Sequence, residues 1–321
     1  MANDARTLEE RLTPLTSDRW AGVVLIMLAA AAWSTAGVFV STIASGSGLN
    51  GIGLAFWRCL ATCLVLGLYL LATDRERLRV SRSDLPWLAG MGGLAIGPFQ
   101  ALWIMSALVN GAAVSTVIGA NAPVIVTLLA WVFWHEPLRW RKWAAIGLAL
   151  LGTLAVASPF ITGGARITPG GLALALGAAT AYAMITLFTK PLAGRHSPAT
   201  TLTYAFGFAA LALLPFQIGR PLPRGATPDA WAAFAALIGL TTIAGYASYT
   251  LGLRRLPASV ASIIAMVEVP CAAVLAGLFL GERLAAVQWL GALAVMGGVA
   301  ILALGGRTRG SALSEQQASV L

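Results

Sequence analysis

The chain contains one hydrophobic unit twice. Residues 101–152 align with residues 247–298 at an offset of 146 positions. The identical or similar pairs in this alignment include Ala112/Ala258, Val114/Val260, Thr116/Ser262, Ile118/Ile264, Glu136/Glu282, Leu138/Leu284, Trp143/Trp289 and Gly152/Gly298. Upstream the offset becomes 149, a loop-sized difference of three residues, with the pairs Gly22/Gly171, Trp33/Tyr182 and Phe39/Phe188. Such a repeat predicts a pseudo-symmetric protein, and in membrane proteins this symmetry accompanies alternating access to a central site.

The repeated unit belongs in a membrane, because the chain carries too few charges for a soluble surface. Hydrophobic residues make up 58% of the sequence and charged residues 10%, against about 45–50% and about 25% in soluble domains. We therefore expect an integral membrane protein without a separate soluble domain. Its three cysteines, Cys59, Cys63 and Cys271, lie in apolar segments and are expected to serve as small packing residues.

Ten apolar runs are long enough to cross a bilayer as helices, which takes roughly 20 residues. They lie near 20–45, 50–72, 86–109, 112–134, 143–158, 170–189, 198–218, 230–253, 258–280 and 287–304, and the fifth and tenth are the shortest. The predicted fold class is therefore an all-α polytopic membrane protein, with ten transmembrane helices that divide into five plus five.

The positions of Lys and Arg predict the direction of each helix. With the N-terminus in the cytoplasm, sixteen of these residues fall on the cytoplasmic side and four on the opposite side. This asymmetry places both termini in the cytoplasm. The net charge of +9 comes from these dispersed loop residues, so nucleic acid is not an expected partner. Since each repeat has an odd number of helices, the second repeat enters the membrane from the other face and the two form an inverted pair.

The predicted organisation follows from these spans. About 19 largely polar residues precede the first apolar run, which is too long for a cleavable signal and is expected to be retained. The expected parts are a cytoplasmic N-terminal segment (1–19), a first five-helix repeat (20–158), an external linker (159–169), a second five-helix repeat (170–304) and a cytoplasmic tail (305–321).

The residues that carry the repeat also resemble a known family. The first half reads APVIVTLLAWVFWHEPL and then WAAIGLALLGTLAV, and the second half reads EVPCAAVLAGLFLGERL and then WLGALAVMGGVAIL. The stretch AWSTAGVFV in the first apolar run is similar to the same family's pattern. Each half resembles an EamA domain, and the whole chain resembles the drug/metabolite transporter superfamily. This resemblance implies two inverted five-helix repeats and the export of amino acids, nucleobases, sugars or drugs.

Two prolines in the resembling segments predict helix kinks. Pro123 precedes Glu136 by 13 residues, whereas Pro270 precedes Glu282 by 12. We therefore expect the kink in the ninth helix to be displaced relative to the kink in the fourth. The two glutamates lie at helix ends on opposite sides of the membrane, where capping and interfacial anchoring are their expected roles.

Only two charged residues lie well inside the predicted spans. Glu268 is about ten residues into the ninth helix, where a charge costs around 2.5–3.5 kcal/mol. It is expected either to serve the site or the coupling of transport to protons, or to lock two helices by hydrogen bonds. Arg58 in the second helix has three open roles: it binds a substrate carboxylate, pairs with Glu268, or extends to the outer headgroups.

Aromatic and polar side chains in the middle of spans predict a binding site between the repeats. Phe99, Gln100 and Trp103 lie in the third helix, and the offset pairs the last two with Tyr246 and Tyr249 of the eighth. A second equivalent pair is Trp33 of the first helix and Tyr182 of the sixth, with Asn121 supplying hydrogen bonds nearby. Equivalent residues are expected to face one another across a central cavity, which would accept an amphipathic or aromatic ligand. Ordinary helix packing is the alternative for each of them.

The small residues Gly291, Ala294, Gly297 and Gly298 predict either close helix packing or a dimer face. The oligomeric state, monomer or homodimer, stays open. No cofactor or metal is expected, and no Gly-x-x-x-x-Gly-Lys sequence is present, so gradients would supply the energy.

The expected function is secondary transport of a small organic metabolite, in the export direction, across a bacterial-type inner membrane. Amino acids, aromatic ones in particular, are the favoured class, on the strength of the aromatic pairs and a resemblance to amino-acid exporters of the YddG type. The partners are this substrate, membrane lipid and, if transport is coupled, protons. The alternatives are an uncoupled facilitator, an exporter of drugs or nucleobases, and a channel or receptor. An enzyme is not expected, because the spans lack His and paired carboxylates.

Overall fold

The computed structural model describes residues 17–134, 140–157, 167–192, 195–219, 226–256 and 258–305, and every regular element within these ranges is a helix. Eight helices of this part of the chain are long and apolar enough to cross a membrane, and a shorter apolar helix covers Ala286–Leu302. With the 17-residue helix α9 they make a ten-helix membrane fold of two halves.

The first half has five helical passes, three of which consist of more than one segment. Their bounds are α2 (Ser17–Ser34) with α3 (Ala36–Ser47), α4 (Gly51–Thr73), α5 (Leu85–Gly90) with the π-helical η2 (Met91–Ile96) and α6 (Gly97–Asn110), α7 (Ala112–Gly119) with α8 (Ala122–Trp134), and α9 (Trp140–Val156). A short 3₁₀ helix, η1 (Arg75–Leu78), follows the second pass.

The second half repeats this order. Its elements are α10 (Pro169–Thr189) followed by η3 (Lys190–Leu192), α11 (Pro198–Leu213) with η4 (Leu214–Phe216), α12 (Pro228–Ala236) with the π-helical η5 (Leu237–Ala244) and α13 (Gly245–Leu253), α14 (Ala258–Ala265) with α15 (Glu268–Leu280), and α16 (Ala286–Gly305). The first pass is interrupted at Thr35, whereas its equivalent α10 is continuous.

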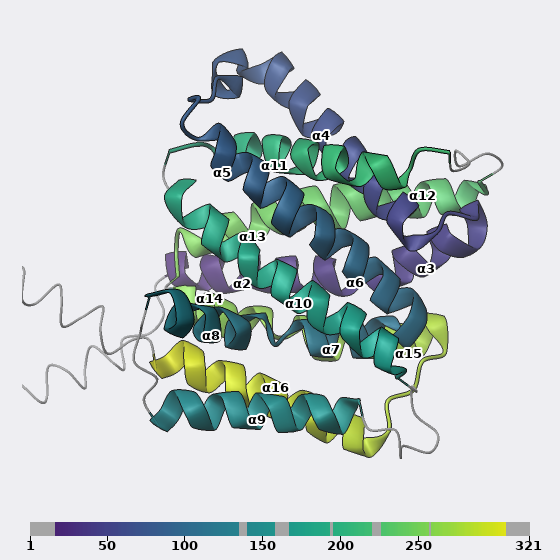
Figure 1. Ribbon diagram of the computed structural model, residues 1–321, viewed down its shortest axis with the longest axis vertical. Helices are drawn as coiled ribbons and strands as arrows, with labels where there is room; N and C mark the ends of the chain where they lie inside the picture. The colour runs from purple at the N-terminus through teal and green to yellow at the C-terminus, as the bar shows by residue number, and fades with distance from the viewer. Residues whose placement is uncertain are drawn as a thin grey trace, which may run out of the picture.

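The two halves pack against each other rather than standing side by side as separate domains. Equivalent passes meet through the contacts α4–α11, α7–α15 and α9–α16. The first pass contacts the eighth through α2 and α13, and by the same symmetry the third contacts the sixth through α6 and α10. In Figure 1 the passes run across the molecule, and α9 and α16 lie together along one edge. The space at the centre is therefore enclosed by helices of both halves.

Small residues allow α9 and α16 to approach closely. A Cβ atom on Gly152 would collide with the backbone oxygen of Gly291, and one on Gly291 would collide with that of Gly152. A Cβ atom on Gly298 would meet the backbone oxygen of Ala145 in the same way. Of the two roles expected for the glycines of the tenth helix, the structure shows close packing within the chain.

The fourth and ninth passes are interrupted at equivalent positions. The first interruption is at Ala120–Asn121 and the second at Met266–Val267, which is the repeat offset of 146. The expected displacement of the second kink is therefore wrong. Pro123 and Pro270 both lie in the first turn after an interruption, where backbone N–H groups lack helical partners in any case. A shift of one residue between the prolines thus leaves the interruption in place.

Candidate functional site

A cavity of about 510 Å³ lies between the two halves, next to the interruptions of the fourth and ninth passes. Its volume is within the range of about 300–1,000 Å³ that is usual for small-molecule sites. The predicted site residues that line it are Trp33, Arg58, Phe99, Gln100, Trp103, Pro123, Tyr182, Tyr246, Tyr249 and Glu268. Helices from both halves thus contribute to one space.

Ring contacts across the two halves shape the cavity wall. Trp33 contacts Tyr246 and Tyr249, with ring centroids 5.6 and 5.2 Å apart, and Phe99 contacts Tyr182 at 5.1 Å. The sequence predicted that Trp33 would face its repeat equivalent Tyr182, but the ring contacts of the described residues pair different helices. The reason is the packing of the first pass on the eighth and of the third on the sixth.

Arg58 is buried and its guanidinium bonds to side chains of both halves. Nε and Nη2 donate to Oγ1 of Thr242 at 3.2 and 3.0 Å, and Nη1 donates to Oε1 of Gln100 at 3.1 Å. Within the described ranges no ion pair joins it to Glu268. The side chain therefore turns towards the cavity rather than the outer headgroups, and its hydrogen-bond partners are neutral.

Glu268 is the first residue of α15 and lines the cavity directly after the interruption. No hydrogen bond joins its carboxyl group to another described residue, so the structure does not show the bonds of a lock between helices. Tyr246 interacts electrostatically with both Arg58 and Glu268, and Tyr182 interacts with Glu268. Among the described residues, the cavity lining therefore contains one cationic group, one acidic group and phenol groups that interact with them.

Asn121 does not line the cavity, contrary to its predicted place among the substrate contacts. Its Nδ2 donates to the backbone oxygen of Ile118 at 2.9 Å and to Oγ1 of Thr153 at 2.8 Å. These bonds tie the interruption of the fourth pass to α9. The Ile118 carbonyl also accepts from the backbone N–H of Asn121 at 3.1 Å, so the side chain adds a further donor at the interruption.

Thr242, which accepts two of the bonds from Arg58, was not predicted from the sequence. Thr241 and Thr242 are adjacent hydroxyl residues in an otherwise apolar run, and both are buried. That pair was the available signal, but only the packing of η5 against α4 connects it to Arg58.

Glu282 caps a helix of the opposite half. Its carboxylate oxygens accept from the backbone N–H groups of Ala112 and Ala113 at 2.8 and 3.0 Å, at the start of α7. Gly111 precedes them with φ 89°, and a Cβ atom there would crowd the carboxylate. The expected capping role thus takes the form of a bond between halves. The equivalent Glu136 lies outside the described residues.

The cavity extends away from this capped end. Val126 and Thr127 of α8, with Val299 and Leu302 of α16, line it towards the side predicted to be cytoplasmic. At the end capped by Glu282, Nδ2 of Asn110 donates to the backbone oxygen of Gly171 at 2.8 Å. This bond also joins the two halves.

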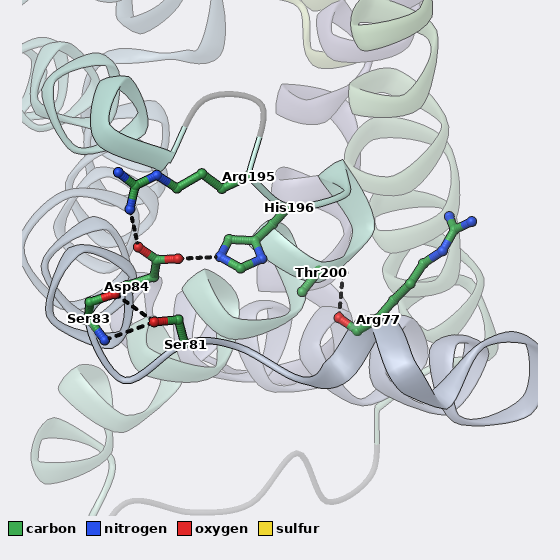
Figure 2. A network of polar contacts seen from close by, with 7 residues as sticks. All are labelled: Arg77, Ser81, Ser83, Asp84, Arg195, His196 and Thr200. Carbon is green, nitrogen blue, oxygen red and sulfur yellow. Dashed lines mark hydrogen bonds and ion pairs between the residues drawn. The ribbon is translucent and has the colours of Figure 1, made fainter.

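A polar cluster joins the halves on the predicted cytoplasmic side (Figure 2). Asp84 lies before α5 and bonds to Nη1 of Arg195 at 2.7 Å and to Nε2 of His196 at 2.8 Å. The hydrogen bond with His196, and then the bond and charge of Arg195, lower the pKa of Asp84, although burial opposes them. Oγ1 of Thr200 also donates to the backbone oxygen of Arg77 at 3.0 Å. These contacts connect the loop after α4 to the start of α11.

Known proteins resemble this chain along most of its length. A family model described as the EamA-like transporter family matches residues 20–158 and again residues 169–304. The uncharacterized transporter YwfM of Bacillus subtilis is 27% identical over 90% of this chain and 96% of its own. A solved crystal structure that is 19% identical, with a TM-score of 0.61 over 89% of this chain and 98% of that chain, shows likeness of fold alone.

Two further relatives have names that mention a substrate. A probable terminal-alkyne amino-acid exporter of Streptantibioticus cattleyicolor is 27% identical over 80% of this chain and 84% of its own. A probable amino-acid metabolite efflux pump of Salmonella typhimurium is 30% identical over 78% of this chain and 88% of its own.

Proposed function

Since the chain belongs to the EamA-like transporter family, we propose that it exports small organic metabolites, amino acids and especially aromatic ones, by alternating access around the central cavity. The observation that carries this proposal is the composition of the cavity wall. Arg58 offers donors for a carboxylate, Glu268 offers an acceptor for an ammonium group, and aromatic rings line the same cavity. A zwitterion with an aromatic side chain matches all three features.

The direction of transport is supported by the relatives, since two of them are named as an exporter and an efflux pump. The membrane is proposed to be a bacterial-type inner membrane with both chain termini in the cytoplasm. Sixteen Lys and Arg residues on one side, against four on the other, support this orientation.

The orientation is tested by labelling in a background without the three native cysteines. Cysteine replaces Arg79 in the loop after η1 or the exposed Ser45 near the end of α3. An impermeant thiol reagent should label the Ser45 variant from outside intact cells and the Arg79 variant only after the cells are opened. Labelling of both from one side would contradict ten crossings.

The substrate class is tested by counterflow in proteoliposomes of the purified protein. The panel contains aromatic and aliphatic amino acids, nucleobases and cationic drugs. We expect counterflow that saturates with aromatic amino acids. Saturation distinguishes a carrier from a channel, and counterflow limited to nucleobases or drugs would overturn the amino-acid assignment. Proton antiport is the favoured energy source because Glu268 lines the cavity, and uncoupled facilitation is the second candidate.

A further inference from the structure

The π-helical segment η5 gives one hydroxyl group an unusual set of partners. Oγ1 of Thr242 donates its proton to the backbone oxygen of Leu237, five residues earlier, at 3.0 Å. A hydroxyl group has one proton to donate and two lone pairs. With the proton used on Leu237, the lone pairs are left for acceptance, and the same oxygen accepts from Nε and Nη2 of Arg58. The hydrogen-bonding capacity of Thr242 is therefore fully used.

Gln100 holds the guanidinium from the opposite half. It is buried on α6 just after η2, the π-helical segment equivalent to η5, and its Oε1 accepts from Nη1 of Arg58. A guanidinium group has five N–H donors in one plane. Three of them are used by Thr242 and Gln100, so that one N–H remains on each terminal nitrogen. Two such donors match the two oxygens of a carboxylate.

The charge of Arg58 lacks compensation from its hydrogen-bond partners, because both are neutral side chains. The pair Arg58 and Glu268 is not bonded, and the nearby ionisable groups that interact with Arg58 are Tyr246 and Cys59. A buried cation with neutral partners favours an anionic group that brings its own acceptors. Since Arg58 lines the cavity, the substrate is the source of that group.

We propose that Thr242 and Gln100 are positioning residues that orient Arg58 as a carboxylate subsite, so that transport selects a free carboxylate over the corresponding amide. This proposal rests on the proposed transport function and adds the chemical group that the site selects. Its rival is a structural role, in which Arg58 only links α4, α6 and η5.

The test compares acid and amide pairs with purified full-length protein. The probes are phenylalanine with phenylalaninamide and indole-3-acetate with indole-3-acetamide, measured by counterflow and by thermal shift. Thr242→Val keeps the shape of the side chain but removes both acceptor lone pairs, whereas Thr242→Ser keeps them. Thr62→Val is the matched control, because Thr62 is buried one turn from Arg58 on α4 and its hydroxyl has no hydrogen-bond partner among the described residues.

We expect the wild type, Thr242→Ser and Thr62→Val to prefer the acid by about tenfold or more, the effect of one charge-assisted hydrogen bond. In Thr242→Val the preference should fall to about threefold or less. If Thr242→Val loses thermal stability but still prefers the acid over the amide, Thr242 has a structural role and the proposal is overturned.

The failure of this proposal and that of the proposed function give different results. Saturable counterflow of compounds without a carboxylate, with no preference for the acids, would retain the transporter and reject the subsite. Absence of any counterflow, with acid-selective thermal stabilisation that depends on Thr242, would reject the assigned function and support the subsite.

Discussion

The fourth and ninth passes are interrupted at equivalent positions, yet the two interruptions differ in chemistry. In the first, Asn121 uses its side chain on Ile118 and Thr153, within its own half. In the second, the equivalent residue is Val267, and the next position carries Glu268 where the first half has Ala122. Glu268 lines the cavity, whereas Asn121 does not. The repeat therefore sets where the backbone opens, and single substitutions decide which opening presents an ionisable group.

This difference has a consequence for transport, because a symmetric fold with symmetric side chains would offer the substrate two equal walls. Here Arg58 has no basic counterpart and Glu268 has no acidic counterpart in the other repeat. A bound zwitterion would thus take one orientation in the cavity, although the surrounding helices are related by pseudo-symmetry.

The largest expected effect comes from removing the charge of the second interruption. Glu268→Gln keeps the shape and hydrogen bonding of the side chain but cannot ionise. If transport is coupled to protons, this variant should lose the response of flux to an imposed pH gradient. It should keep most of its substrate counterflow, because the amide oxygen can still accept a hydrogen bond from an ammonium group. Flux is measured in proteoliposomes, with an ionophore that collapses the gradient as the control.

Two outcomes would break this part of the comparison. A wild-type flux that ignores the gradient would favour facilitation and leave Glu268 as a substrate contact or structural residue. A variant that still responds to the gradient would mean that another group carries the proton.

A smaller effect is expected from the aromatic walls, which test whether the halves contribute equally. Trp103→Ala and Tyr249→Ala change residues at equivalent positions, and both line the cavity. Each should raise the apparent substrate constant by about tenfold through lost aromatic contact. Counterflow at varied substrate concentration measures this constant. Low yield of protein with an unchanged constant would assign these residues to packing.

The first interruption should respond through stability rather than substrate binding. Asn121→Ala removes the donor to Ile118 and Thr153 and should cost about 1–3 kcal/mol, because buried polar groups lose a partner. The midpoint of thermal unfolding should fall while the substrate constant stays unchanged. Val267→Ala at the equivalent, exposed position is the control and should change neither. A raised substrate constant in Asn121→Ala would restore this residue to the site.

The smallest effect concerns the charge of Asp84, which is predicted to lie outside the membrane, in contrast to the charge of Glu268 in the cavity. Because His196 and Arg195 lower the pKa of Asp84 in the folded protein, the unfolded chain binds the proton more readily. The stabilisation is fully present above the unfolded pKa of about 4 and is lost as the pH falls through the lowered folded value.

The measurement is the thermal midpoint as a function of pH. Asp84→Asn should lower the midpoint at neutral pH and show a weaker decline below about pH 4 than the wild type. Asp74→Asn changes an exposed pair with Arg77 and should behave like the wild type. Equal acid declines in wild type and Asp84→Asn would show that the cluster does not contribute.

The sequence by itself determined the number of helices, the division into two repeats and the aromatic and charged residues around the cavity. Helix length follows from the thickness of the bilayer, and the cost of a charge in hydrocarbon makes Arg58 and Glu268 conspicuous without any structure. Length and charge are properties of a single segment, so they can be recognised without knowing how the segments pack.

Only the tertiary structure decided which side chains are partners. The contact of Trp33 with Tyr246, the bonds of Arg58 to Thr242 and the capping of α7 by Glu282 each join helices of different halves. The residues in these pairs are separated by more than 160 positions, and the repeat alone suggested other pairs. Their physical cause is the way the first pass crosses the eighth and the third crosses the sixth, and this crossing depends on the packing of all ten helices together.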